Sequence, residues 1–99
     1  MTKPTTHDLF IGGEWSKADN TERDTIRNPA TGDVLAHVAV AGESDVKRAL
    51  QTAQDAFPAW RGLIATDRAD YLYRLIELIQ RDTEKLARII TSENGKPLK

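Results

Sequence analysis

The chain has 99 residues, of which 39% are hydrophobic and 29% charged, with a formal net charge of −1 and no cysteine. These values fit one globular segment and leave no room for a second full domain. The near-neutral charge argues against a nucleic-acid surface, which needs a basic patch, and equally against an anionic membrane surface. The lack of cysteine excludes disulfides, thiolate zinc sites and thiol nucleophiles within these residues.

The beginning of the chain is polar. Residues 1–8 include Pro4 and several threonines but no apolar run, so we expect a disordered terminus and no signal peptide. No apolar run elsewhere in the sequence approaches the length of a membrane span. We therefore expect a cytoplasmic protein that binds neither a membrane nor a nucleic acid.

A β-hairpin is predicted over residues 9–15. The apolar run Leu9-Phe10-Ile11 is separated from Glu14-Trp15 by the pair Gly12-Gly13. Two glycines can adopt the positive φ angles that a tight two-residue turn requires. Because no helix follows these glycines, the pattern favours a structural turn over a phosphate-binding loop.

Short extended pieces are predicted next. Residues 17–23 form a polar loop, and Thr25-Ile26-Arg27 is a short strand that ends at the turn of residues 28–32, because a residue before proline is biased away from the helical region. Residues 34–40 alternate between two faces and predict a further strand. His37 in this strand lacks a neighbouring cluster of ligand residues, so the pattern favours an ordinary strand residue over a metal ligand.

The first helix is expected to begin at Gly42 or Ser44, either of which can cap it, and to end or kink at Pro58, which lacks a backbone donor. Its apolar residues recur at helical spacing and include Phe57 and Trp60. We expect these two aromatic residues to anchor the helix to a neighbour. A stacking platform for a base or a sugar is the alternative interpretation.

The second and longest helix is expected to begin at Thr66-Asp67. Apolar residues recur in steps of three and four over residues 69–90, and a break or kink is expected at Asp82-Thr83, where a new turn can be capped. Asn94-Gly95 suits a left-handed helix cap, and Pro97 prevents the helix from resuming. A coiled coil is the alternative, but the apolar stripe is shorter than four heptads.

These elements predict an α+β segment, with an N-terminal β-hairpin and short strands followed by two long helices. The sequence contains no glycine-rich phosphate loop and no Ser, His and Asp set around a recognisable nucleophile. Its many acidic residues fall on predicted solvent-facing positions. We therefore expect no catalytic and no cofactor-binding residue in this chain, and the pattern alone indicates no reaction.

Four short motifs nevertheless stand out. They are Phe10-Ile11-Gly12-Gly13-Glu14-Trp15, Asn28-Pro29-Ala30-Thr31-Gly32-Asp33-Val34, Ala56-Phe57-Pro58-Ala59-Trp60-Arg61 and Glu93-Asn94-Gly95-Lys96-Pro97-Leu98. In this order and at this spacing they resemble the amino end of NAD(P)-dependent aldehyde dehydrogenases. The resemblance covers about Leu9 to Lys99, and the last two motifs are most similar to succinate-semialdehyde dehydrogenases.

The resemblance implies an α/β fold for the whole enzyme and a chemistry whose groups lie outside this chain. In the family, a cysteine forms a thiohemiacetal with the aldehyde, hydride passes to NAD or NADP, and a glutamate activates water. Residues 9–99 would then be an incomplete framework of the cofactor domain, with the catalytic domain absent. We expect this segment alone to be inactive and to bind no cofactor, and the complete enzyme to be a homo-oligomer.

The resemblance also implies candidates for a structural monovalent-cation site found in some family members. Backbone oxygen near the Asn-Pro motif, at Ile26 or Arg27, would be one ligand, and the acid before the fourth motif, Glu93, would be another. The family has the shorter Asp at this position. The alternative is that Glu93 only precedes the helix cap.

Three hypotheses follow for the chain. It is the amino-terminal segment of an aldehyde dehydrogenase, whose aldehyde and whose choice of NAD or NADP the sequence does not indicate. Alternatively, it is a non-catalytic accessory or remnant protein that packs on a dehydrogenase subunit through its helices. The third hypothesis is an unrelated helical interaction module. In the first two, the apolar stripes of the helices are half of an interface.

Overall fold

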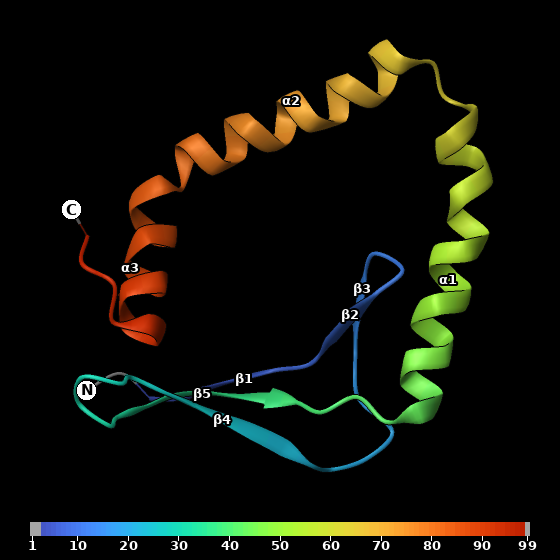
Figure 1. The fold of residues 1–99 in the computed structure, drawn as a ribbon. Helices are drawn as coiled ribbons and strands as arrows, with labels where there is room; N and C mark the ends of the chain where they lie inside the picture. The colour runs from blue at the N-terminus through green and yellow to red at the C-terminus, as the bar shows by residue number, and fades with distance from the viewer. Residues whose placement is uncertain (1–2, 99) are drawn as a thin grey trace.

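The computed structural model describes residues 3–98, in which five strands precede three helices (Figure 1). The elements are β1 Thr5–His7, β2 Leu9–Ile11, β3 Glu14–Ser16, β4 Arg23–Arg27, β5 Val34–Ala39, α1 Glu43–Gly62, α2 Ala65–Arg81 and α3 Thr83–Asn94. The predicted α+β character of the segment is confirmed.

The predicted hairpin is formed by β2 and β3, which pair antiparallel. Gly12 and Gly13 occupy the turn with φ angles of 64° and 81°, in the region that favours glycine. Phe10 lies directly opposite Trp15, and their ring centroids are 4.9 Å apart. The turn chemistry and this cross-strand aromatic pair together account for the hairpin.

The other three strands form a sheet in the order β1-β5-β4, with β4 antiparallel and β1 parallel to β5. The expectation of a disordered terminus over residues 1–8 is therefore wrong for Thr5–His7, which pair with Ala36–Val38. The edge of β5 pairs with β1 through backbone hydrogen bonds, which do not depend on the side chains of β1. The polar sequence of residues 5–7 therefore did not indicate a strand. Met1 and Thr2 lie outside the described residues.

The turn between β4 and β5 follows its sequence closely. The Asn28 carbonyl accepts a hydrogen bond from the backbone N–H of Gly32 at 2.7 Å, and the Asn28 side-chain oxygen accepts one from the N–H of Ala30 at 2.8 Å. Gly32 has a φ angle of 79°. This Asx-type turn directs the chain back into β5 and confirms the predicted turn.

Of the two outcomes expected at Pro58, an end or a kink, the first is wrong, because helix α1 continues to Gly62. The proline removes one backbone hydrogen bond, to the carbonyl of Gln54. Gln54 is exposed, so water can satisfy the freed carbonyl. The cost of the interior proline is thereby reduced, and the helix persists for another turn.

The long helix predicted from Thr66 is divided into α2 and α3 at Asp82, which confirms the expected break at this position. Asp82 has a ψ angle of 16°, outside the helical range. Helix α3 then ends at Gly95 in the left-handed conformation, with a φ angle of 87° and its N–H bonded to the carbonyl of Thr91. The predicted glycine cap is confirmed.

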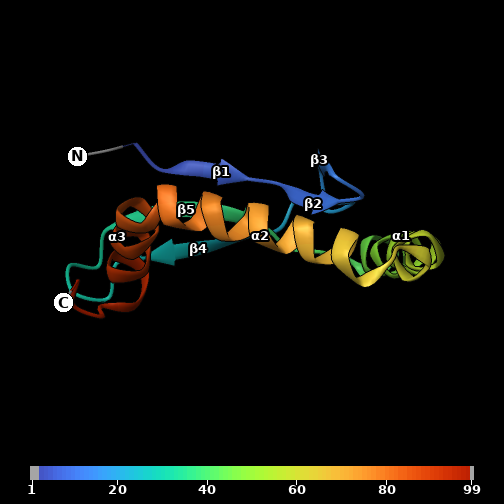
Figure 2. The ribbon, with the colours of Figure 1, turned by 90° about the horizontal axis from the view of Figure 1, so that it is seen from above.

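The described residues form a flat, open frame. In Figure 1 the three helices make three sides and the strands the fourth, and Figure 2 shows that the whole arrangement is thin. Its extents are 48 × 37 × 18 Å, and its radius of gyration is 17.2 Å, whereas a compact domain of this length has about 13 Å. A frame of this shape places its helices and strands side by side without a second layer to cover them.

The frame has almost no core of its own. Ala36 is the one buried hydrophobic residue among residues 3–98. The accessible surface is 8276 Å², whereas a folded monomer of this mass exposes about 5,600 Å². The helices therefore present apolar surface that this chain does not cover.

The hairpin turn gives a first prediction. Replacing Gly12 with Ala should destabilise the chain by about 1–2 kcal/mol, because an L-residue is strained at positive φ. A Cβ at this position would also lie 3.1 Å from Cγ2 of Thr52. The change is measured as a shift in the urea midpoint, followed by circular dichroism.

Gly62→Ala is the matched control, since Gly62 lies in a helix and a Cβ there meets open space. It should leave the midpoint unchanged or raise it slightly, because alanine restricts the unfolded chain. Equal midpoints for the two variants would contradict the strained-turn account.

Candidate functional site

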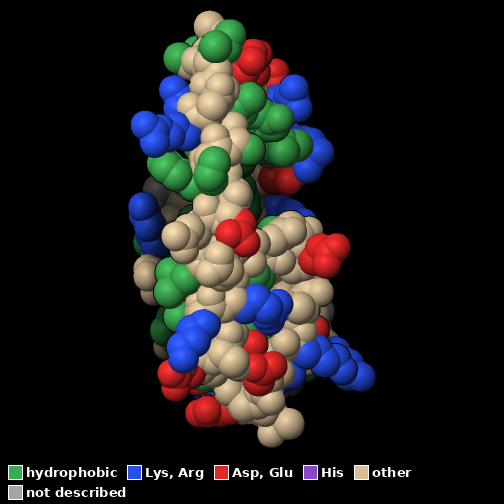
Figure 3. Space-filling model, turned by 90° about the vertical axis from the view of Figure 1, so that its right-hand side faces the viewer, with side chains coloured by type: hydrophobic (Ala, Val, Ile, Leu, Met, Phe, Trp, Pro, Cys, Tyr) green, Lys and Arg blue, Asp and Glu red, His purple; other side chains and the backbone are tan. Residues whose placement is uncertain are grey.

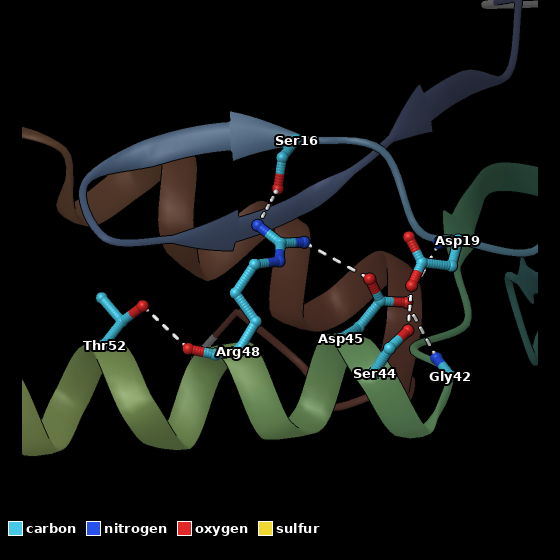
Figure 4. Close-up of polar contacts among 7 residues, drawn as sticks. All are labelled: Ser16, Asp19, Gly42, Ser44, Asp45, Arg48 and Thr52. Atoms are coloured by element: carbon cyan, nitrogen blue, oxygen red, sulfur yellow. Dashed lines mark hydrogen bonds and ion pairs between the residues drawn. The ribbon is translucent and has the colours of Figure 1, made fainter.

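A cluster of hydrogen-bonded side chains joins α1 to the hairpin and to the loop before β4 (Figure 4). Asp45, Arg48 and Thr52 lie three and four residues apart and so share one face of α1. Arg48 donates to the hydroxyl of Ser16 at 3.3 Å, and Thr52 lies against the Gly12 turn. Polar side chains of α1 therefore help to hold the hairpin.

Asp45 is the centre of this cluster and is only 1% exposed. Its carboxylate accepts backbone hydrogen bonds from Gly42 at 2.9 Å and from Asp19 at 3.1 Å, and one from the guanidinium of Arg48 at 3.3 Å. The N–H of Gly42, then that of Asp19, and finally Arg48 lower the pKa of Asp45, while burial opposes them. In return, the hydroxyl of Ser44 donates to the carboxylate of Asp19.

The Asp45 cluster connects backbone segments to one another. It lies at the N-terminus of α1, a position where phosphates bind in some proteins. The N-terminus of a helix that follows a strand can hold a pyrophosphate when its backbone N–H groups are free. Here the N–H of Gly42 is already bonded to the carboxylate of Asp45, and Glu43 adds a second acid to the first turn. The carboxylates of Asp45 and Glu43 thus place negative charge at the N-terminus of α1, which disfavours a phosphate there.

A second feature is an open pocket of about 280 Å³ between the β4–β5 turn and the end of α3. Its lining includes Asn28 from the turn, and Ser92 and Gly95 from the helix end. A Cβ on Gly95 would lie 3.5 Å from Cγ of Pro29. The second and fourth sequence motifs, far apart in the chain, therefore meet at this pocket.

The candidate cation ligands lie near this pocket, but the residues that line it do not include them. Ile26 and Arg27 are the last two residues of β4, and Glu93 is exposed in the last turn of α3. Within residues 3–98, no three His, Cys, Asp or Glu side chains are grouped so that they could hold a metal ion. His37 is hydrogen-bonded to the hydroxyl of Thr25, at 3.4 Å, as a residue of the sheet.

The apolar faces of the helices are the third feature. Trp60 contacts Tyr71 of α2 with ring centroids 5.7 Å apart, and the guanidinium of Arg74 lies 5.3 Å from the Tyr71 ring. The expected anchoring by Trp60 is therefore observed, whereas Phe57 is 57% exposed. Figure 3, which views the α1 side, shows charges of both signs interspersed with hydrophobic side chains.

Sequence reasoning missed the role of Asp45. Its three-residue separation from Gly42 is the spacing of a capping box, in which the side chain at the third helical position bonds the N–H of the cap residue. That signal was present in the sequence. The bond to Asp19, 26 residues away, was not predictable from local spacing.

Among residues 3–98, no helix is both long enough and apolar enough to cross a membrane.

Comparison with known proteins places these features in context. Residues 15–99 match the model of the aldehyde dehydrogenase family. Glutarate-semialdehyde dehydrogenase of Pseudomonas putida is 44% identical over 89 residues, which are 90% of this chain and 18% of that protein. The chain thus spans about a fifth of the length of the curated relatives it matches.

Solved structures share the open frame. The succinate-semialdehyde dehydrogenase of Burkholderia pseudomallei matches 93% of this chain and 19% of its own, at 40% identity and a TM-score of 0.89. An aldehyde dehydrogenase of Mycobacterium tuberculosis, solved in complex with NAD+, matches 96% of this chain and 20% of its own, at 28% identity and a TM-score of 0.89. The frame is therefore the same when a much longer chain surrounds it.

The Asp45 cluster generates a stability prediction. Asp45→Ala should lower the urea midpoint, because it leaves the N–H groups of Gly42 and Asp19 without their partner in a buried place. Glu43→Ala is the control, since Glu43 is also an acid in the first turn but is exposed and pairs only with Lys47. A midpoint loss no larger than that of Glu43→Ala would contradict the assigned role.

The pH dependence follows from the same contacts. The folded pKa of Asp45 lies below its ordinary value of 3.8, so its contribution is complete above that value and is lost as the pH falls through the folded pKa. The urea midpoint of the wild-type chain should therefore fall in this acidic range. The midpoint of Asp45→Asn, which lacks the charge, should fall less steeply, and identical profiles would exclude Asp45 as a source.

Proposed function

The chain belongs to the aldehyde dehydrogenase family, and from this we propose that it is the amino-terminal framework of an enzyme that oxidises an aldehyde to a carboxylic acid with NAD+ or NADP+. The observation that carries the proposal is the family match over residues 15–99, together with a frame that coincides with solved dehydrogenases. The framework role fits a chain in which a cluster of hydrogen-bonded side chains joins α1 to the hairpin and to the loop before β4.

The proposed substrate class is a semialdehyde, an aldehyde that carries a carboxylate at its other end. The support is the names of two relatives, a glutarate-semialdehyde and a succinate-semialdehyde dehydrogenase. The resemblance of the last two motifs favours succinate semialdehyde. We assign to these residues no group that would distinguish a shorter semialdehyde from a longer one. The primary proposal is therefore the semialdehyde class, and succinate semialdehyde is the secondary proposal.

The cofactor would be held elsewhere in the enzyme. NAD+ or NADP+ accepts hydride from the substrate in this chemistry. The helix N-terminus that follows β5 is disfavoured as its binding site, because Asp45 and Glu43 place carboxylates in the first turn of α1. We therefore assign to this chain no cofactor-binding and no catalytic residue, and the chain alone should be inactive.

The proposed partner is the remainder of a dehydrogenase, and the complete enzyme would be a homo-oligomer in the cytoplasm. The monovalent-cation site at Ile26, or the neighbouring Arg27, and Glu93 stays part of this proposal. The accessory-protein hypothesis differs in one respect: the chain would then pack on a dehydrogenase subunit without being part of its chain. The uncovered helix faces are compatible with both.

A chimera tests the proposal. This chain replaces the matching 89 residues of the Pseudomonas putida enzyme, and oxidation of glutarate semialdehyde is followed with NAD+ and with NADP+. Activity should stay within about tenfold of the parent, equivalent to about 1.4 kcal/mol in activation free energy. The parent without its matching segment, and the chain alone, should show no turnover.

Two results would overturn the proposal. Turnover by the pure 99-residue chain would place the chemistry inside it. Full activity of the parent enzyme without the segment would show that the enzyme does not need this framework.

A further inference from the structure

The end of α3 carries a chemically reactive dipeptide, Asn94-Gly95, which is the one Asn-Gly pair in the sequence. The other two asparagines, Asn20 and Asn28, precede a threonine and a proline. The backbone nitrogen that follows an asparagine can attack its side-chain amide, and glycine allows this approach because it has no side chain. Proline has no N–H and does not react in this way. The sequence therefore distinguishes Asn94 from the other two asparagines.

The reaction at this pair needs water and no other reagent. The backbone nitrogen of Gly95 loses its proton to hydroxide and forms a bond to Cγ of Asn94. The bond between Cγ and Nδ2 of Asn94 breaks, and the amide nitrogen leaves as ammonia. The resulting succinimide ring then takes up one water molecule at either of its two carbonyl carbons. Opening of the ring leaves an aspartate or an isoaspartate at position 94.

The fold exposes this pair to water but restrains its reacting groups. Asn94 and Gly95 are both exposed. The N–H of Gly95, whose nitrogen is the nucleophile, donates a hydrogen bond to the carbonyl of Thr91 at 2.9 Å. Asn94 is the last residue of α3, and a planar succinimide holds the ψ angle of residue 94 far from the helical value. Both restraints must be released before the ring can close.

We propose that Asn94 is a site of spontaneous deamidation, and that the left-handed cap of α3 controls its rate. Helix ends open locally at a much lower free energy than the whole fold. Each opening frees the N–H of Gly95 from Thr91 and lets residue 94 leave the helical conformation. This inference does not depend on the proposed function, because the reaction involves only Asn94, Gly95 and water.

Both products would weaken the corner where α3 meets the β4–β5 turn (Figure 1). An aspartate at position 94 places a second acid beside Glu93, in a last turn that has no basic residue. The C-terminus of a helix is already negative, so this charge is unfavourable. An isoaspartate adds one carbon to the backbone just before Gly95, where a Cβ would lie 3.5 Å from Cγ of Pro29. Deamidation therefore changes how the end of α3 contacts the turn.

The test measures deamidation of the 99-residue chain at mildly alkaline pH, in buffer and in urea, and of the Pseudomonas putida chimera in buffer. Mass spectrometry follows each asparagine, and methylation by an isoaspartyl methyltransferase detects isoaspartate. In urea Asn94 should react fastest and Asn28 should not react. In buffer Asn94 should react at least about threefold more slowly than in urea, because its cap must open first. Asn94→Gln should abolish the signal at this position, since a six-membered ring closes much more slowly.

Each part of the inference has its own contradicting result. Reaction of Asn94 no faster than that of Asn20 in urea would overturn the assignment of the site. Equal rates in urea and in buffer, for both the chain and the chimera, would overturn control by the cap, whereas slower reaction in the chimera alone would support it. Asn94→Asp should lower the urea midpoint of the chain more than the uncharged Asn94→Gln does. Equal midpoints would overturn the expected weakening of the corner.

Discussion

The carboxylate of Asp45 is the contact on which the attachment of the strands to the helices depends. It is buried and charged, and a buried charge is tolerated only when hydrogen-bond donors surround it. Two backbone N–H groups and Arg48 provide those donors, and through Arg48 the network reaches Ser16 in the hairpin. One side chain thus sets the start of α1 and holds the hairpin and the loop before β4 against this helix.

Most large apolar residues of this chain are exposed, whereas in a self-contained domain they are buried in a core. Hydrophobic burial is the main driving force of folding. Here polar contacts join the hairpin and the loop before β4 to α1, while large apolar side chains such as Leu50 and Leu72 stay exposed. This exposure supports the proposed framework role, since the compared family members are about five times as long as this chain. In the proposed framework role, the apolar stripes are surface that the remainder of a dehydrogenase would cover.

Local chemistry was enough to predict the features that depend on neighbouring residues. The Gly12-Gly13 hairpin, the turn after Asn28, the break at Asp82 and the cap at Gly95 each follow from backbone preferences within a few positions. Strand β1 and the bond between Asp19 and Asp45 were missed because each depends on a partner more than 20 residues away. Pairing at such distances is determined by the folded arrangement, and spacing along one chain does not encode it.

The motifs that carried the family resemblance also have a physical role, and it is a framework role. The first is the hairpin turn against α1, and the second and fourth, at Pro29 and Gly95, meet beside one pocket and so bring the end of α3 to the sheet. The third covers the proline turn of α1 and Trp60, which packs on α2. These residues form the turns and contacts at the corners of the frame, so they indicate the family through its fold. A fold does not specify a substrate, which is selected by the groups that contact it.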